Sequence, residues 1–154
     1  MDPYHIEKFR YPVVLRLLGG AELAGDMFVQ TRAPYREGPE APPDILNGQE
    51  PYFPLVREDG QTLLVAKDRV VDVQAVMPED ADPLRMPGAR ASVLEFTLAG
   101  GLVLSGEVLL ELPADRARPL DYLNRLDERF LTLRTADGLR FLNRRLIELV
   151  RPLD

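Results

Sequence analysis

Few side chains in this chain of 154 residues could do chemistry, and their spacing favours binding over catalysis. The sequence contains no cysteine, which excludes disulfides, thiolate nucleophiles and zinc–thiolate sites. His5 is the only histidine, and no base or acid partner for it is visible. Gly19-Gly20 and Gly100-Gly101 lack the lysine that follows the glycines of a phosphate-binding loop. We therefore expect no catalytic residue and no cofactor, and we expect that the protein is not an enzyme.

Two polar pairs share the pattern Asp-x-Leu-Asn, namely Asp44 with Asn47 and Asp121 with Asn124. An asparagine side chain can hydrogen-bond a base edge or a backbone, so these four residues are candidate binding residues. The alternative is structural. The aspartates would be N-caps of short helical turns, and Asn47-Gly48 would end the first turn in a left-handed conformation.

The positive charges concentrate near the end of the sequence, at Arg140, Arg144, Arg145 and Arg151. If Arg140 and Arg144 lie on one strand, they share a face. They could contact phosphates or the acidic surface of a neighbouring subunit, so Arg140, Arg144 and Arg145 are candidate binding residues. Protection of an edge strand by charge is the alternative.

An acidic group, Glu79, Asp80 and Asp82, could offer oxygen ligands to a hard cation. It lacks the glycine turn and the terminal glutamate of a calcium loop, so we expect a solvated linker and no metal site. The whole chain is also acidic, with a formal net charge of −6 and a pI near 4.9. This charge disfavours nucleic acid as a partner.

The chain shows neither a secretory signal nor an apolar run approaching the roughly 18 residues that a membrane helix needs. We therefore expect no membrane contact. Because cysteine is absent, a reducing compartment suits the chain, and we expect a cytoplasmic protein.

The candidate residues recur because the chain repeats itself. Five signals follow in the same order in both halves: a glycine pair, a glycine inside a strand pattern, Asp-x-Leu-Asn, an Asp-Gly turn and a basic pair before an aliphatic strand. This order predicts a tandem duplication. The matched positions are Gly19-Gly20 with Gly100-Gly101, Gly25 with Gly106, Asp44 and Asn47 with Asp121 and Asn124, Asp59-Gly60 with Asp137-Gly138, and 66–73 with 142–150.

Each half predicts five short strands and one helical turn. In the first half the strands fall at 13–18, 21–29, 52–56, 62–68 and 69–76. Gly25 and Gly106, each inside the second strand of its half, indicate a bulge or a sharp bend that lets a small sheet curl. We expect an all-β fold of two units, 10–77 and 91–154, joined by a linker at 78–90 that contains prolines and acidic residues.

This layout resembles the Sm-like (LSm) superfamily of five-stranded, SH3-like small barrels. Gly20 and Gly101 are similar to the family's turn glycine, and Gly25 and Gly106 to its strand-two glycine. Asn47 loosely resembles the asparagine of the family's next loop, as does Asn124. Neither half has the family's Arg-Gly pair, and the Asp-x-Leu-Asn spacing is one residue short. The resemblance implies two tandem Sm-like barrels, each with one short helical turn.

The predicted architecture suggests two alternative functions. We expect a non-catalytic binding or scaffold module that acts through protein–protein contacts, with itself or with another protein, and that forms a homo-oligomer because edge strands invite pairing. The alternative is binding of RNA or single-stranded nucleic acid of the Sm-like type, through the asparagine loops and the arginine group.

Overall fold

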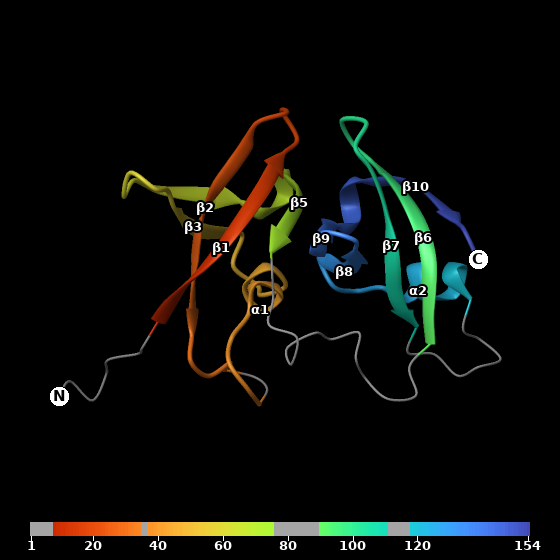
Figure 1. Cartoon of the computed structure of the whole chain (residues 1–154), viewed down its shortest axis with the longest axis horizontal. Helices are drawn as coiled ribbons and strands as arrows, with labels where there is room; N and C mark the ends of the chain where they lie inside the picture. Colours follow the sequence, from red (N-terminus) through yellow and green to blue (C-terminus); the bar gives the residue numbers. More distant parts are fainter. Residues whose placement is uncertain (1–7, 35–36, 76–89, 111–117) are drawn as a thin grey trace.

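The computed structural model describes residues 8–34, 37–75, 90–110 and 118–154 (Figure 1). Its ten strands form one sheet in the order β10-β6-β7-β8-β9-β5-β1-β2-β3-β4, and every paired neighbour is antiparallel, which confirms the all-β class. The sheet is not closed, because β10 and β4 each have a neighbour on one side only. His5, the acidic group at 79–82 and the predicted linker at 78–90, except for Arg90, lie outside the described residues.

The elements follow the predicted order closely. The first half contains β1 (Lys8–Leu17), β2 (Glu22–Gln30), the helix α1 (Pro42–Leu46), β3 (Tyr52–Val56), β4 (Thr62–Ala66) and β5 (Val70–Ala75). The second half contains β6 (Arg90–Leu98), β7 (Val103–Leu110), the helix α2 (Pro119–Arg125), β8 (Phe130–Thr135), β9 (Gly138–Asn143) and β10 (Ile147–Pro152). A 3₁₀ turn precedes the last strand of each half, at Lys67–Arg69 and at Arg144–Leu146.

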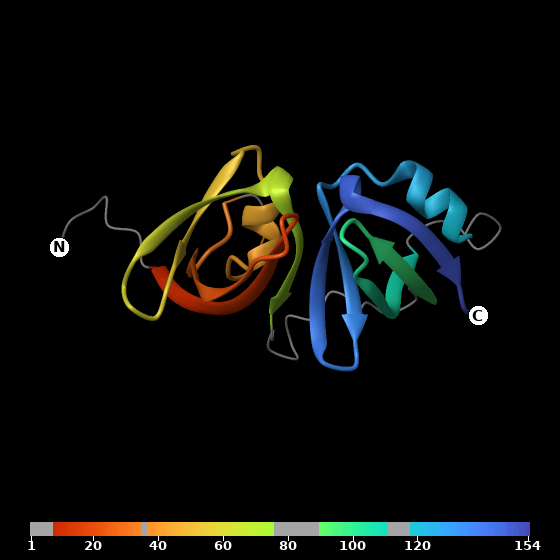
Figure 2. The ribbon, with the colours of Figure 1, turned by 90° about the horizontal axis from the view of Figure 1, so that it is seen from above.

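Strand pairing joins the two halves where the sequence predicted two separate barrels. The first half has the strand order β5-β1-β2-β3-β4 and the second half has β10-β6-β7-β8-β9. Each half curls into its own lobe, and β5 of the first lobe pairs with β9 of the second (Figures 1 and 2). The result is one continuous open sheet with two lobes, and the predicted boundary at residue 77 lies outside the described residues.

The glycine inside the second strand of each half allows the third strand to approach closely. A Cβ built on Gly25 would lie 2.8 Å from the Val56 carbonyl oxygen, and one built on Gly106 would overlap the Arg134 carbonyl oxygen. At each place the second and third strands share a single paired position, Asp26 with Val56 and Glu107 with Arg134. Only glycine leaves room for this crossing, which agrees with the sequence prediction of a bend there.

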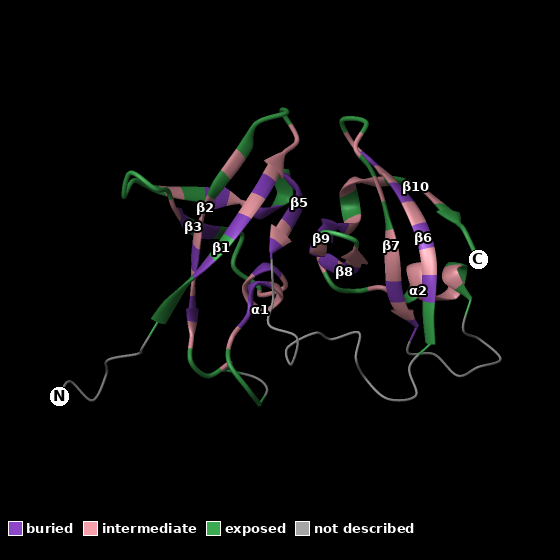
Figure 3. Cartoon of the chain, viewed as in Figure 1, coloured by how far each residue is buried: buried purple, intermediate pink, exposed green. Residues whose placement is uncertain are grey.

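Two hydrophobic clusters fill the lobes, and each one takes in side chains from the other half. Buried residues alternate along β1 and β6, as expected for strands with one face on a core (Figure 3). The cluster of the first lobe includes Phe130, Leu139 and Phe141 of the second half. The cluster of the second lobe includes Val71 of the first half. The halves therefore share their cores as well as their backbone pairing.

Candidate binding site at the sheet edges

The pairing of β5 with β9, together with the side chains packed across it, is called the junction below. Its backbone register places Val73 opposite Phe141 and Ala75 opposite Leu139. Val71 is the unpaired residue of a bulge, because the register of β1 against β5 passes from Val70 to Asp72. Val71 is buried in the core of the second lobe. The junction therefore shows how the fifth strand of one half covers the fourth strand of the other half.

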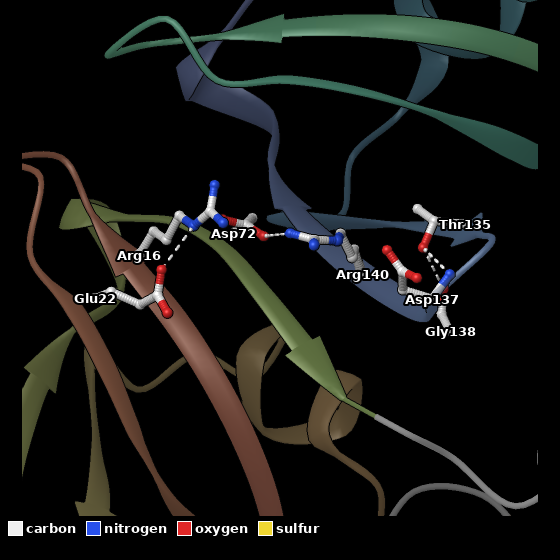
Figure 4. A network of polar contacts seen from close by, with 7 residues as sticks. All are labelled: Arg16, Glu22, Asp72, Thr135, Asp137, Gly138 and Arg140. Atoms are coloured by element: carbon white, nitrogen blue, oxygen red, sulfur yellow. Dashed lines mark hydrogen bonds and ion pairs between the residues drawn. The ribbon is translucent and has the colours of Figure 1, made fainter.

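An ion pair crosses the junction. Arg140 Nη1 donates to Asp72 Oδ2 at 2.8 Å, and both residues are buried (Figure 4). Arg16, itself paired with Glu22 at 3.4 Å, adds positive charge on the other side of Asp72 (Figure 4). Asp72 Oδ1 is buried without a hydrogen-bond partner, and burial raises the pKa of Asp72 despite the opposing effects of Arg140 and Arg16.

Two asparagines add hydrogen bonds across the junction. Asn143 donates from Nδ2 to the Val70 carbonyl at 2.9 Å and to the Lys67 carbonyl at 3.3 Å. Asn47, a candidate binding residue, accepts from the backbone N–H of Phe130 at 2.7 Å through Oδ1. Asn47 therefore connects the end of α1 to the start of β8, which gives this candidate a structural contact within the chain.

The basic residue at the start of each 3₁₀ turn holds the end of the short helix. Lys67 Nζ donates to the Ile45 carbonyl at 2.6 Å and to the Gly48 carbonyl at 3.3 Å. Burial lowers the pKa of Lys67, Arg129 lowers it further, and Glu50 opposes both effects. Arg144 occupies the equivalent position in the second half and donates to the Leu126 carbonyl. Both side chains donate to carbonyl groups at the end of a helix, and the Ile45 carbonyl also accepts the Gly48 N–H at 3.1 Å.

The candidate aspartates lie inside the helices, and the prediction that they are N-caps is wrong. The N-cap residues are Ala41 and Arg118, because Pro42 and Pro119 begin the helices. Asp44 is the third helical residue and accepts from the Ala41 N–H at 2.8 Å. Asp121 accepts from Arg118 Nε at 2.8 Å.

The left-handed helix end predicted at Asn47-Gly48 is also wrong. Asn47 has φ −90°, and Gly48 is not among the described glycines with positive φ. The helix end is bonded without a left-handed residue, by the Asn47 N–H to the Pro43 carbonyl at 2.9 Å and by Lys67 Nζ to the Ile45 carbonyl.

The remaining candidates do not form one surface. Arg140 lies on β9 within the junction, whereas Arg144 and Arg145 lie in the 3₁₀ turn after that strand. The expectation that Arg140 and Arg144 share a strand face is therefore wrong. Arg145 and Asn124 are exposed. The structure thus brings Arg140 and Asn47 to the junction and leaves Arg145 and Asn124 at the surface.

The two free edges carry apolar side chains where their counterparts at the junction are buried. Leu64 on β4 is 74% exposed and corresponds to the fully buried Phe141 on β9. Tyr52 is 59% exposed and corresponds to Phe130, since Tyr52 pairs with Ala66 as Phe130 pairs with Asn143. On the other edge, Leu149 of β10 is 68% exposed. The β4 edge therefore corresponds in position to β9, which is covered inside the chain. It also shares part of the apolar character of β9.

Other features of the described residues offer less for binding. A hollow of about 440 Å³ lies between β2 and the turn after β3, lined by Glu22, Leu23, Ala24, Arg57, Glu58 and Asp59. Within the described ranges, no group of three histidine or acidic side chains is arranged to hold a metal. The helices of the described residues are all too short or too polar to cross a membrane.

Comparison with protein-family models, with curated proteins and with solved structures finds no match to this chain. The candidate site therefore depends on its geometry alone. Sequence reasoning missed three of its main residues, Leu64, Asp72 and Asn143. The one available signal was Asp72, a single acidic residue inside the aliphatic strand 70–75. An aspartate within such a strand is rarely buried unless it is paired.

Proposed function

We propose that the chain is a non-catalytic binding and scaffold module made of two duplicated Sm-like β-barrel units. It acts through protein–protein contacts at the free edges of its sheet. The partner adds a strand to β4, so that main-chain hydrogen bonds supply affinity and the neighbouring apolar side chains supply specificity.

Matching details in the two halves support the duplication. The strand order is the same in both, and a close-approach glycine lies in the second strand of each. Lys67 N–H bonds the Pro51 carbonyl as Arg144 N–H bonds the Arg129 carbonyl. The last strand of each half also has a bulge at the same place, at Val71 and at Glu148. These shared irregularities are harder to explain by chance than shared strands.

The exposed β4 edge is the observation that carries the proposal. An edge strand presents unpaired N–H and C=O groups, and proteins usually protect it with charge, proline or a bulge. The five residues of β4 are Thr-Leu-Leu-Val-Ala and contain neither a charged residue nor a proline. The equivalent strand β9 is covered by β5. The chain thus already covers one fourth strand, β9, with a fifth strand. The uncovered fourth strand β4 is therefore the best candidate site for a partner strand.

Nucleic-acid binding has weaker support from the same residues. Arg140 is paired with Asp72, and Arg144 bonds the Leu126 carbonyl. Both contacts use donor groups that a phosphate would need. Together with the net charge of −6, this makes protein the favoured class of partner.

A differential capture experiment tests the proposal. Wild-type protein, Leu64→Lys and the control Val103→Lys are immobilised and exposed to a lysate of the cells that make the chain. Val103 is 51% exposed at the start of β7, away from both free edges. We expect wild type and Val103→Lys to retain the same proteins and Leu64→Lys to lose them. Equal retention by all three proteins contradicts the proposal.

A further inference from the structure

We propose that the strand that covers β4 is β10 of a second copy of this chain, added in the register that β5 uses against β9. This inference rests on the proposed binding function of the β4 edge and names its partner. Whether the two edges can pair depends on which backbone groups face outward on each. In antiparallel strands, consecutive residues direct their N–H and C=O groups to opposite sides.

On β4, the outward groups belong to Thr62, Leu64 and Ala66. The Lys67 N–H bonds the Pro51 carbonyl at 2.9 Å on the β3 side, so alternation turns Ala66, Leu64 and Thr62 toward the free edge. The partner of Leu64 on β3 is Pro54, which has no N–H to offer and agrees with this assignment.

On β10, the outward groups belong to Val150 and Pro152. The Leu153 N–H bonds the Val93 carbonyl at 2.9 Å on the β6 side. Alternation then directs Pro152 and Val150 away from β6. Both free edges therefore have outward groups at the positions that correspond to the paired residues of the junction.

The register of the junction brings complementary side chains together between two copies. Where the junction has Val73 opposite Phe141, the contact between copies has Val150 opposite Leu64. The ion pair of Asp72 with Arg140 becomes an apolar contact, because Leu149 and Leu63 occupy the corresponding positions. Burial of Leu64 and Leu149, both largely exposed in the single chain, favours the contact.

The polar contact that Asn47 makes at the junction can also form between two copies. Asn47 accepts the N–H of Phe130 at the junction. Asn124 is its counterpart in the second half and is exposed. In the proposed contact, Asn124 of one copy accepts the N–H of Tyr52 in the other.

Two residues of β10 make this contact weaker than the junction. Glu148 takes the place of Val71, which is buried in the core of the adjoining lobe, and a carboxylate there would lose hydration. Pro152 takes the place of Ala75 and removes one N–H from the pairing. β10 therefore pairs with a neighbouring strand less favourably than β5 does. Association between copies is reversible, whereas the junction lies within one chain and is permanent.

The contact is head-to-tail, since β4 of one copy meets β10 of the next. Such a heterologous contact extends from copy to copy until a ring closes. A symmetric pairing of two β4 strands is the competing arrangement. It would use Leu64 but none of the β10 residues, which separates the two arrangements experimentally.

Light scattering at increasing protein concentration tests the proposal on four variants compared with wild type. Starting from the 17.4 kDa monomer, we expect the wild-type mass to rise with concentration. The rise should persist in Val103→Lys and disappear in Leu64→Lys. In Glu148→Val and in the double variant Glu148→Val/Pro152→Ala it should begin at lower concentration. For the double variant we expect a midpoint about tenfold lower or more, the equivalent of about 1.4 kcal/mol.

Several results would overturn the inference. A mass that stops at a dimer and ignores both β10 changes would indicate symmetric β4 pairing. A monomer at every concentration in wild type and double variant would exclude self-association. If the lysate capture nevertheless depends on Leu64, the proposed function stands and only the second copy is excluded as partner. Circular dichroism of each variant checks that the fold is retained.

Discussion

Asp72 and Arg140 meet at 2.8 Å inside the sheet and join β5 of the first half to β9 of the second. Leu149 and Leu63 occupy the corresponding positions on the two free edges. The chain thus uses a buried ion pair where the lobes are permanently joined and leucines where the strands are uncovered. This difference distinguishes the junction from any contact between copies, and it leads to the first prediction.

Replacing Asp72 by alanine should lower the free energy of unfolding by about 3–5 kcal/mol, because Arg140 would stay buried without its partner. The double variant Asp72→Leu/Arg140→Leu should recover most of this loss, since leucines occupy the corresponding positions at the free edges. Urea unfolding of the two variants and of wild type measures the effect. A double variant no more stable than Asp72→Ala would contradict the expectation that two leucines can replace the ion pair.

The pH dependence of stability should contain a contribution from Asp72 with a definite sign. Burial raises the pKa of this carboxyl, so the folded protein holds the proton at a pH where the unfolded chain, with a pKa of about 4, has released it. The free energy of unfolding of wild type relative to Asp72→Asn should therefore fall as pH rises from about 4 through the raised pKa. Urea unfolding of both proteins between pH 4 and pH 7 measures this difference, and a difference that grows with pH would refute the assignment.

Asn47 and Asn124 should differ in their effect on stability although the sequence pattern treats them alike. Asn47→Ala removes the acceptor of the Phe130 N–H and should cost about 1–2 kcal/mol. Asn124 is exposed in the single chain, and Asn124→Ala should stay within about 0.5 kcal/mol of wild type. Thermal unfolding at low protein concentration compares the two directly. Equal losses would show that the bond across the junction contributes nothing.

Substitution of the close-approach glycines should be costly. Gly106→Ala would place a methyl group against the Arg134 carbonyl and should destabilise the fold by about 1–3 kcal/mol. Gly25→Ala, whose Cβ would lie 2.8 Å from the Val56 carbonyl oxygen, should act in the same direction. Gly19→Ala is the matched control, because no atom lies within 4 Å of its added Cβ. If all three variants unfold at the same urea concentration, the close approach is not what these glycines provide.

Much of the fold could be predicted from the sequence because its signals are local. Strand β3 was predicted at its observed bounds, since aromatic and aliphatic residues alternate there between turn residues. Gly25 and Gly106 were predicted at a bend, because a glycine inside a strand pattern has few other uses. The helix starts differ from the prediction because a proline stands two residues before each Asp and begins the helix there.

The junction could not be predicted, because pairing between distant strands leaves no local pattern. Nothing in 66–73 or 142–150 indicates that β5, which pairs with β1 of its own half, also pairs with β9 of the other half. The sequence therefore gives no reason to expect that Arg140 is buried and Leu64 exposed. Only the assembled sheet shows that one is covered and the other exposed.

Amide hydrogen exchange at Leu64 tests most directly whether the β4 edge is the recognition surface. We expect the Leu64 N–H to exchange quickly in dilute protein and to become protected as concentration rises, whereas the Val73 and Phe141 N–H groups at the junction stay protected throughout. An unchanged, fast exchange at Leu64 under conditions in which the chain associates or holds a captured partner would contradict it.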